Sequence, residues 1–274
     1  MAMRFTKMHG AGNDYIYVDG INQDVNRDPD FIKRISDRHF GVGADGMIVL
    51  EKSELYDFKM AMYNADGSQG QMCGNGIRCL GKFAYDHHLT NQLDLRFETL
   101  AGLRTVHLLE DNGQIVGGRV DMGEPTLLTS ALPMMIDQDN FVNEPLNIMN
   151  HTYQATAVSV GNPHLVLFVD QMPDDLTEIG EALNNDPMFP EGVNVEFVTV
   201  IDHTHIKMRV YERGSGETLA CGTGACAAAY ACIIGQQMAR TIEVELSGGK
   251  LQVDYSSGHL FLTGEACTVF EGDY

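Results

Sequence analysis

The chain has 274 residues, of which 44% are hydrophobic, 20% charged and 8% aromatic. This composition supplies a core and excludes wholesale disorder, and at about 150 residues per domain the length favours about two domains. Lysine and arginine number 18 against 38 aspartates and glutamates, so the formal net charge is −20. So acidic a surface argues against binding to nucleic acid or to an anionic membrane, and we expect neither as a partner.

The chain carries no signal for export or for a membrane span. Its first residues lack the apolar segment of a secretory signal. Its most apolar stretch, Leu219 to Gly235, is rich in small residues and contains Gly222 and Gly224, unlike a span of about 20 large apolar residues. Six cysteines are too sparse for a disulfide scaffold. We therefore expect a cytoplasmic protein with reduced thiols.

Helices and strands can be predicted in chain order. The first helix has Asp28 as a suitable N-cap and Pro29 in its first turn, and it runs through Phe40. Further helices are predicted over 77–88, 173–184 and 225–237, and the last is so rich in alanine that it should be buried all round. Strands are predicted where apolar residues alternate, at Ile206/Met208/Val210, Ile242/Val244/Leu246 and Leu251/Val253/Tyr255.

Two segments of the chain repeat one another. Residues 59–76 and 207–224 align without a gap over 18 positions, and six residues are identical, where about one is expected by chance. In both segments a lysine lies 14 residues before a cysteine, Cys73 or Cys221, that opens a Cys-Gly-x-Gly motif. We infer two halves of one ancestral unit, each a mostly antiparallel sheet with a helix packed on it.

The two Cys-Gly-x-Gly motifs each place a cysteine at the entrance of a predicted helix. The positive end of a helix lowers a thiol pKa, and its unbonded N–H groups can hold a carboxylate. Two such sites facing one another across a cleft could remove a proton from one face of a carbon and return one to the other face. This chemistry inverts a stereocentre, and a duplication supplies the two bases that it needs.

Metal binding and simple burial are the competing interpretations of these cysteines. Cys73 and Cys79 are six residues apart, and Cys221 and Cys226 are five apart, which are not the close pairs of structural zinc sites. His203 and His205 lack a third ligand nearby, so we expect no metal. Cys79, Cys226 and Cys232 are interpreted as small hydrophobic residues. Burial alone would not explain why the repeat retains both Cys73 and Cys221 within the same glycine frame.

The motifs taken together resemble the diaminopimelate epimerase family. The resemblance rests on four segments that follow one another in the family's order: Met8–Asp14, Asn64–Cys79, Gly161–His164 and Tyr211–Ala225. It implies an isomerase that interconverts LL- and meso-2,6-diaminopimelate without pyridoxal phosphate or another cofactor. That reaction lies on the route to lysine and peptidoglycan. The resemblance also implies a homodimer.

The resemblance further implies a fold. The predicted class is α+β, with two pseudo-symmetric lobes, each a mostly antiparallel sheet or barrel wrapped around a central helix, and the active site in the cleft between them. The C-terminal tail returns to the first lobe. With a linker near Gly123-Glu124-Pro125, the first lobe is predicted to contain residues 1–122 plus 264–274, and the second residues 123–263.

Site residues follow from the resemblance, position by position. Cys73 and Cys221 are the two acid/base thiols, and His164 and Glu212 tune them. Substrate contacts are expected from Asn13, Asn64, Gly74, Asn75, Asn162, Asn194, Glu212, Arg213, Gly222 and Thr223. Two positions depart from the family pattern. Gly46 stands where some members have glutamine, and Phe270 stands at an expected dimer contact where tyrosine is frequent.

Two other functions remain open at this point. A proline- or hydroxyproline-racemase-like enzyme would share the two-thiol chemistry, but that family typically has histidine where Asn75 stands and a different segment around Glu212-Arg213-Gly214. A non-catalytic amino-acid-binding relative is the other, although both cysteines are present. Residues 67–71 and 214–218 flank the thiols and are rich in glycine and small polar residues, so we expect lids that close on the substrate.

Overall fold

The computed structural model describes residues 2–274, and spatial contacts divide the chain into two compact units. Unit 1 comprises Met1–Asp121 and Thr263–Tyr274, and unit 2 comprises Met122–Leu262. Each is described below by itself. That residues 1–122 plus 264–274 and residues 123–263 are the two functional lobes of the protein stays a prediction.

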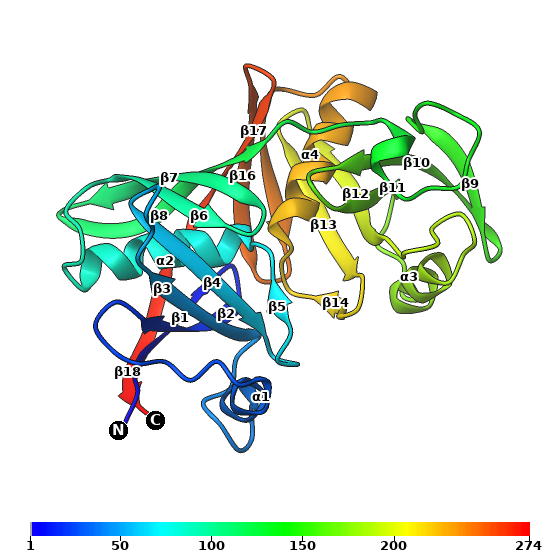
Figure 1. Ribbon diagram of the computed structural model, residues 1–274. Helices are drawn as coiled ribbons and strands as arrows, with labels where there is room; N and C mark the ends of the chain where they lie inside the picture. Colours follow the sequence, from blue (N-terminus) through cyan, green and yellow to red (C-terminus); the bar gives the residue numbers. More distant parts are fainter. Residues whose placement is uncertain (1) are drawn as a thin grey trace. The chain divides into compact units, whose positions relative to one another are not determined.

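Unit 1 contains two helices, nine strands that lie wholly or mostly within it, and the end of a tenth; the elements are labelled in Figure 1. The helices are α1 (Pro29–Ser36) and α2 (Gly74–Asp86). The strands are β1 (Arg4–Gly10), β2 (Asn13–Asp19), β3 (Gly46–Glu51), β4 (Phe58–Asn64), β5 (Gln69–Gly70), β6 (Asp94–Thr99), β7 (Gly102–Asp111), β8 (Gln114–Gly123) and β18 (Cys267–Asp273). Strand β8 runs on into unit 2, and β17 (His259–Glu265) enters from it.

Unit 2 also contains two α-helices, α3 (Leu176–Asn184) and α4 (Gly222–Gly235), and one short 3₁₀ helix (Thr129–Ala131). Its strands are β9 (Glu144–Ile148), β10 (His151–Ser159), β11 (Pro163–Phe168), β12 (Asn194–Asp202), β13 (His205–Glu212), β14 (Gly216–Thr218), β15 (Thr241–Leu246) and β16 (Gly249–Ser256). Strands β13, β15 and β16 confirm the three alternating patterns, whose apolar residues are largely buried.

The strand pairing of unit 1 is repeated in unit 2. In unit 1 the successive pairs β1–β2, β2–β3, β3–β4, β4–β6 and β6–β7 are antiparallel, parallel, antiparallel, parallel and antiparallel. In unit 2 the pairs β10–β11, β11–β12, β12–β13, β13–β15 and β15–β16 follow the same sequence of directions. The duplication read from 18 positions therefore extends over an entire sheet.

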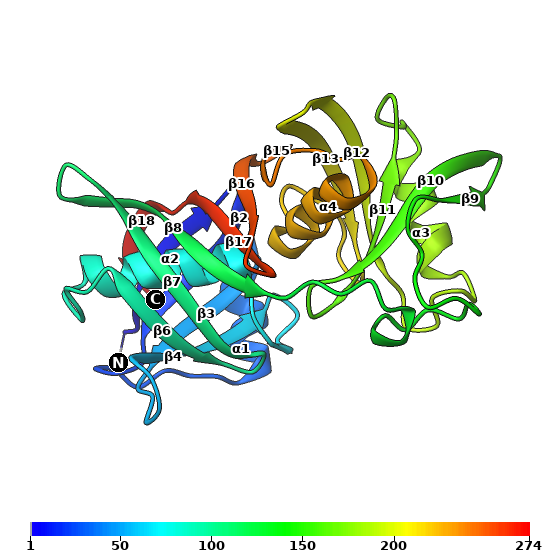
Figure 2. The ribbon, with the colours of Figure 1, turned by 90° about the horizontal axis from the view of Figure 1, so that it is seen from above.

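Each sheet packs on one central helix. Helix α2 contacts β1, β2, β3 and β7, and α4 contacts β10 to β13, β15 and β16 (Figure 2). Helix α2 buries Ile77, Leu80 and Phe83, whereas α4 buries alanine and cysteine on nearly every side. Small side chains let strands approach α4 closely from several directions. The predicted α+β class, with a mostly antiparallel sheet wrapped around a central helix in each half, is confirmed.

The helix bounds differ from the predicted ones for local reasons. Helices α2 and α4 begin three residues earlier than predicted, because Cys73 and Cys221 are themselves the N-caps. Helix α1 ends at Ser36 rather than near Phe40. There the Asp37 carboxylate accepts hydrogen bonds from the N–H groups of His39 and Phe40, at 2.7 and 2.8 Å, and so favours a turn over the helix. Within residues 2–274, every helix is too short or too polar to cross a bilayer.

Candidate active site

Cys73 lies at the junction of a strand-like segment and helix α2. Its backbone is extended (φ −133°, ψ 123°), and its Sγ accepts a hydrogen bond from the N–H of Gly76 at 3.3 Å. The sulfur thus occupies the place that a serine or aspartate oxygen takes in an ordinary N-cap. The first intrahelical bond runs from Ile77 N to Cys73 O. The N–H groups of Gly74 and Asn75 therefore precede the helical ladder, where such groups can bind an anion.

Asn13 connects Cys73 to a group of charged side chains. The Cys73 thiol donates to Asn13 Oδ1 at 3.2 Å, and Asn13 Nδ2 donates to Asp45 at 2.8 Å. Arg38 bridges Asp45 and Asp14, at 2.8 Å to each. Burial raises the pKa of Asp45, with the nearby Asp14 adding to it, while Asn13 and Arg38 partly oppose the rise. The Asn13 amide is therefore fixed in one orientation, with its oxygen toward the sulfur.

The side chain of Asn75 is held by a hydrogen bond from Arg78. The Arg78 guanidinium is fully buried and donates to Asn75 Oδ1 at 2.9 Å and to Gly74 O at 3.2 Å. Gly10 makes room for it, since a Cβ at that position would lie 3.1 Å from Arg78 Nη2. The side chain of Asn75 is consequently buried with Arg78, and its backbone N–H is the group available to a ligand.

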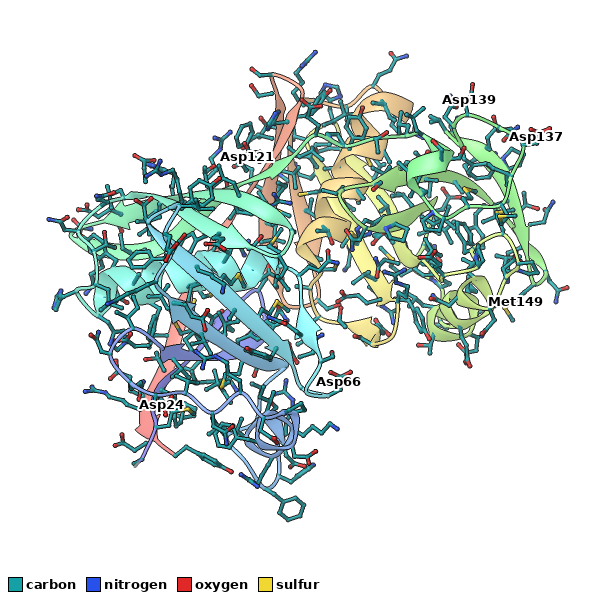
Figure 3. The ribbon with its side chains drawn as sticks, viewed as in Figure 1. Asp24, Asp66, Asp121, Asp137, Asp139 and Met149 are labelled. Atoms are coloured by element: carbon teal, nitrogen blue, oxygen red, sulfur yellow. The ribbon has the colours of Figure 1, made fainter. Side chains whose placement is uncertain are left out.

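Asn64 lies at the end of β4, beside the first predicted lid. Its Nδ2 donates to Ser68 Oγ at 3.0 Å, and Ser68 donates in turn to Asp66 at 2.6 Å. Asp66 is exposed at the edge of unit 1 (Figure 3). Residues 69–70 form β5, which pairs with β4, so part of this lid is a short strand.

Cys221 repeats the geometry of Cys73 in unit 2. Its backbone is also extended (φ −119°, ψ 115°), and its Sγ accepts from Gly224 N at 3.4 Å. Thr223 Oγ1 lies 3.5 Å from the same sulfur. The first intrahelical bond comes from Ala225 N to Cys221 O, so the N–H groups of Gly222 and Thr223 precede the ladder just as those of Gly74 and Asn75 do.

The expected lowering of the thiol pKa is wrong for Cys221. Burial raises the pKa of this thiol well above its ordinary value, and the carboxylates of Glu212 and Glu196 raise it further. The Thr223 hydroxyl and the Gly224 N–H act in the opposite direction but are outweighed. Burial likewise raises the pKa of Glu212, against a 2.5 Å hydrogen bond from Thr218. At neutral pH Cys221 therefore rests as a thiol.

His164 belongs to a buried network in unit 2 that reaches toward Cys221. Its Nδ1 lies 2.7 Å from Glu196 Oε1, and neither side chain is exposed at all. Its Nε2 lies 3.0 Å from Asn162 Oδ1, and Asn162 Nδ2 donates to Thr223 Oγ1 at 3.4 Å. Glu196 is a residue that the sequence analysis missed. No local pattern marks this glutamate, because only the fold brings it to His164.

Asn194 and Arg213 are joined through the backbone. Asn194 Oδ1 accepts from Arg213 N at 2.9 Å, and Asn194 Nδ2 donates to Pro163 O at 2.9 Å. The Arg213 side chain is exposed and donates from Nη1 to Glu191 O at 3.0 Å. In unit 2 the structure thus links Asn162 to Thr223 and Asn194 to Arg213. In unit 1 it brings Asn13 to Cys73, whereas Asn64 bonds within its own loop.

Tyr15 is a second neighbour of a thiol that the sequence analysis missed. It occupies in Gly12-Asn13-Asp14-Tyr15 the place of the histidine in Gly161-Asn162-Pro163-His164. Its hydroxyl interacts with the side chains of Asn13 and Cys73. Burial, followed by the nearby Cys73 and Asp45, raises the pKa of this phenol well above its ordinary value. The two halves thus present a phenol in one and an imidazole in the other.

The two departures from the family pattern have different structural settings. A Cβ at Gly46 would collide with the carbonyl oxygen of Tyr63 on β4, so the backbone here requires glycine. Phe270 lies on β18, is 45% exposed and packs edge-to-face on Phe5, with ring centroids 5.8 Å apart. It has no hydroxyl to donate, but it presents an aromatic surface to solvent.

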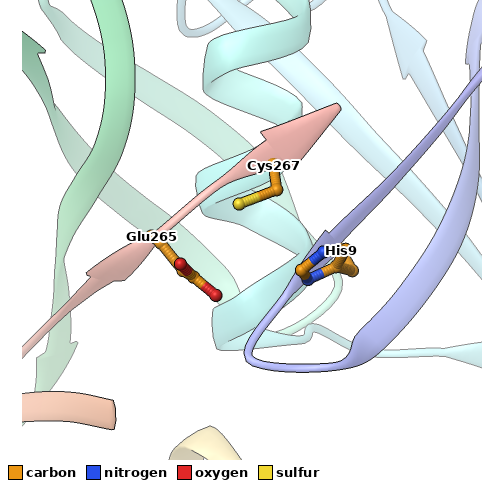
Figure 4. A group of neighbouring side chains, drawn as sticks. All are labelled: His9, Glu265 and Cys267. Carbon is orange, nitrogen blue, oxygen red and sulfur yellow. The ribbon is translucent and has the colours of Figure 1, made fainter. Parts of the chain in front are cut away.

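A third group of polar side chains lies at the start of β18. His9, Glu265 and Cys267 each offer one possible ligand atom, and these atoms lie within 4.8 Å of one another (Figure 4). His9 and Cys267 face each other across the β1–β18 pair. Glu265 is exposed, and the Lys82 ammonium is near enough to oppose the rise that burial and Glu265 cause in the pKa of Cys267. A cation there would meet this repulsion, and none of the three residues belongs to either thiol site.

Comparison with known proteins gives matches over the full length of the chain. The sequence profile of the diaminopimelate epimerase family matches residues 5–128 and 156–269. Diaminopimelate epimerase of Desulfovibrio desulfuricans is 46% identical over 100% of this chain and 99% of its own length. The enzyme of the same name from Acetivibrio thermocellus is 47% identical over 99% of this chain and 98% of its own length.

Solved structures share the fold at much lower identity. A hydroxyproline epimerase from Agrobacterium vitis with bound trans-4-hydroxy-L-proline superposes with a TM-score of 0.67 at 14% identity, over 100% of this chain and 91% of its own. A probable proline racemase from Agrobacterium radiobacter gives 0.69 at 14% identity, over 98% and 92%. At this identity the likeness establishes the architecture alone.

Proposed function

Since the chain belongs to the diaminopimelate epimerase family, we propose that Cys73 and Cys221 act as its two acid/base groups. The activity is the epimerisation of diaminopimelate, an isomerase reaction of lysine biosynthesis. The observation that carries the assignment of the thiols is their repeated N-cap geometry. Each sulfur accepts one N–H of the helix that it begins, and each stands beside two further N–H groups that precede the helical ladder.

In the proposed step, one sulfur acts as thiolate and the other as thiol on opposite faces of the α-carbon. The thiolate takes the α-proton, and the electron pair of the broken C–H bond delocalises into the neighbouring carboxylate. The thiol then gives its proton to the opposite face, so the centre is inverted and the two sulfurs exchange protonation states. Burial keeps Cys221 protonated at rest, which suits it to deliver the first proton.

The N–H groups at the two helix starts would bind the α-carboxylate while charge accumulates on it. Gly74 and Asn75 begin α2, and Gly222 and Thr223 begin α4. Donors fixed by a helix need no reorganisation when the carbanion forms, and the positive helix end favours the extra negative charge. This electrostatic assistance is needed because an α-proton next to a carboxylate is only weakly acidic.

The remaining residues of the candidate site would bind the other end of the substrate. Diaminopimelate carries a second ammonium and carboxylate. Arg213 can donate two hydrogen bonds to that carboxylate, and Glu212 can accept from the ammonium. The side chains of Asn13, Asn64, Asn162 and Asn194 can donate or accept. Asn75 is an exception, since its side chain is buried against Arg78, so we propose that it acts through its backbone.

The proposal extends to the organisation of the enzyme. The two lobes are taken to be the two compact units, with the substrate bound where both thiols can reach one carbon. The enzyme is proposed to act in the cytoplasm as a homodimer, with Phe270 at the contact between subunits. The chemistry uses only side chains and backbone N–H groups, so turnover is expected without added pyridoxal phosphate.

Replacement of either sulfur tests the two-base assignment. Cys73→Ser and Cys221→Ser should each lower kcat by at least about 100-fold, because a hydroxyl is far too weak an acid to form the required anion. The measurement is conversion of LL- to meso-diaminopimelate, together with incorporation of deuterium at the α-carbon in D₂O. Cys232→Ser, at a buried helical thiol outside the site, is the matched control and should retain activity.

The same assays separate the competing functions. Near-normal turnover in either variant would refute the two-base mechanism. Turnover of proline in preference to diaminopimelate by the unaltered protein would favour a racemase-like activity. Binding of diaminopimelate without deuterium incorporation would indicate a non-catalytic relative.

A further inference from the structure

The last residue of helix α3, Asn184, binds the backbone of the segment that leads into β12. Its Nδ2 donates to Val193 O at 2.9 Å and to Gly180 O at 3.0 Å, and its Oδ1 accepts from Val193 N at 3.3 Å. One amide thus pairs with both the N–H and the C=O of Val193, as a neighbouring strand would. The side chain is half-buried, and these bonds fix where the chain lies as it approaches β12.

The segment that Asn184 binds follows a tight turn over residues 189–192. Gly192 N donates to Phe189 O at 2.8 Å, and Gly192 has a φ of +72°, which favours glycine. A Cβ at Gly192 would lie 2.7 Å from Asn184 Oδ1 and 3.0 Å from Arg213 Cδ. Gly192 therefore lies against both the Asn184 amide and the Arg213 side chain, and glycine leaves room for both.

The same turn holds the side chain of Arg213. Arg213 Nη1 donates to Glu191 O, a carbonyl of the turn, at 3.0 Å, while the Arg213 backbone N–H donates to Asn194 Oδ1 at 2.9 Å. A guanidinium has five N–H donors, so the single bond to Glu191 O orients it and leaves other donors for a carboxylate. The Arg213 side chain is exposed, and an exposed arginine samples many rotamers unless a contact holds it.

An arginine that is already held in one orientation binds a carboxylate more tightly than a mobile one. Ordering a long side chain costs free energy, and a side chain ordered before the ligand arrives does not meet that cost on binding. Two parallel hydrogen bonds to a carboxylate also require a particular direction of the guanidinium plane. The hydrogen bonds of Asn184 thus bear on Arg213 through the turn that lies between them in the chain of contacts.

We propose that Asn184 is a positioning residue that holds the 189–192 turn against Arg213, and thereby strengthens binding of the carboxylate of diaminopimelate remote from the reacting carbon. The inference rests on the proposed function, in which Arg213 binds that carboxylate. It deepens that function, because it assigns part of the preference for a substrate with two carboxylates to a side chain on α3. Asn184 acts here through the backbone of the turn and not by contact with the substrate.

Replacement of Asn184 tests this role. Asn184→Ala removes the three hydrogen bonds to the backbone, so KM for diaminopimelate should rise about fivefold or more, while kcat stays within about twofold, since proton transfer is untouched. Asn185→Ala is the matched control. It removes the next asparagine, which is exposed and donates from Nδ2 to Glu181 O at 2.9 Å, and it should leave both constants unchanged. A rise in KM no larger than that of Asn185→Ala would overturn the proposal.

A milder variant keeps the test decisive if Asn184→Ala does not fold, which thermal unfolding of the purified variants reveals. Asn184→Asp keeps the size of the side chain and the acceptor for Val193 N, but it loses both N–H donors. KM should rise in the same direction, about twofold or more, again with little change in kcat. An unchanged KM in a folded Asn184→Asp variant would also overturn the proposal.

A double-mutant cycle separates positioning of Arg213 from a general effect on the fold. Arg213→Lys removes the planar group that can bond Glu191 O and a carboxylate together, so it should raise KM by itself. In that background Asn184→Ala should change KM by less than about twofold, because the group that it positions is gone. An equal rise in KM in both backgrounds would show that Asn184 acts on the fold and would overturn the proposal.

The cycle also distinguishes the two levels of the argument. An unchanged KM in Arg213→Lys would refute the proposed function of Arg213. A raised KM in Arg213→Lys, together with an inert Asn184→Ala, would leave that function standing and refute the role of Asn184 alone.

Discussion

At the scale of single residues, the two thiol sites are built by neighbours that are not themselves expected to touch the substrate. Arg78 fixes Asn75 and Gly74, Asp45 fixes Asn13, and Glu196 fixes His164. Each of these is a charged group that directs a neutral amide or an imidazole. Hydrogen bonds to charged groups are stronger than neutral ones. The orientation of the groups nearest each sulfur is therefore set by charged side chains that do not themselves contact the sulfur.

A substitution of Arg78 tests whether such a charged side chain orients the groups near the sulfur. Arg78→Lys retains the charge but cannot supply the two separated N–H groups that bind Asn75 Oδ1 and Gly74 O. We expect kcat/KM for diaminopimelate to fall by about fivefold, since one weakened hydrogen bond is worth about 1 kcal/mol. Arg96→Lys, at an exposed arginine paired with Asp57, should retain the activity of the unaltered enzyme. Equal losses in both variants would show that Arg78 has no special role.

At the scale of elements, helices α2 and α4 each begin at a thiol proposed for acid/base chemistry and carry buried thiols further along. Burial raises the pKa of Cys79 on α2 to about 12 and that of Cys232 on α4 to about 12. These groups lie among strands that surround each helix, so their ionisation would place a charge in the core. The same residue type is therefore suited to acid/base chemistry at the helix start and is confined to packing in its interior.

This confinement predicts a loss of stability at high pH. Burial raises the pKa of Cys79 to about 12 in the folded state, whereas in the unfolded chain this pKa is near its ordinary value of 9.0. Above that value the unfolded state binds fewer protons, so the free energy of unfolding falls as pH rises, and the stabilisation is complete only below about pH 9. Between about pH 8 and about pH 11, denaturant unfolding should show a drop that is about 2 kcal/mol smaller in Cys79→Ala.

A control separates ionisation from packing. Leu80→Ala removes a neighbouring buried side chain on α2 and should lower stability at every pH without changing its pH dependence. If Cys79→Ala and the unaltered protein lost the same free energy between the two pH values, the buried thiol would not be a source of the alkaline sensitivity.

At the scale of the whole molecule, the same arrangement of strands and helix occurs twice, and the last strand of the chain pairs with the first. The β18 strand pairs antiparallel with β1 over Arg4–His9 and Cys267–Asp273. This pairing completes the first sheet with the last residues of the chain, and it brings Phe270 onto the outer face of unit 1 beside Phe5. Val269 and Phe270 are both large, apolar and exposed there, which supports the proposed contact between subunits.

A charged residue in place of Phe270 tests the proposed dimer contact. Phe270→Asp should raise the dissociation constant of the dimer by about 100-fold or more, because a C2 contact loses the aromatic side chain twice and gains two like charges. Light scattering coupled to size exclusion should then report the mass of one chain rather than two at micromolar concentration. Leu100→Asp, at an exposed leucine elsewhere in unit 1, should remain dimeric. A monomeric unaltered protein would refute the proposed assembly.

The sequence by itself determined the duplication, the helix-start cysteines and the family. Each depends on local patterns: an 18-position repeat, glycines beside Cys73 and Cys221, and strand alternation that reports one buried face. Helix starts were predicted three residues late because a sulfur is not a usual N-cap acceptor. Periodicity cannot reveal that Sγ takes that role.

Only the tertiary structure decided the electrostatics of the two thiols. A helix start alone favours a thiolate, but burial and the carboxylates of Glu212 and Glu196 reverse the balance at Cys221. Arg78, Tyr15 and Glu196 gave no signal of their own, because each acts through residues that the fold brings from another strand or another turn. The desolvation of a group and the partner of its hydrogen bond depend on all the atoms around it in the folded protein. Most of those atoms belong to residues that are distant in the sequence, so the local sequence does not reveal them.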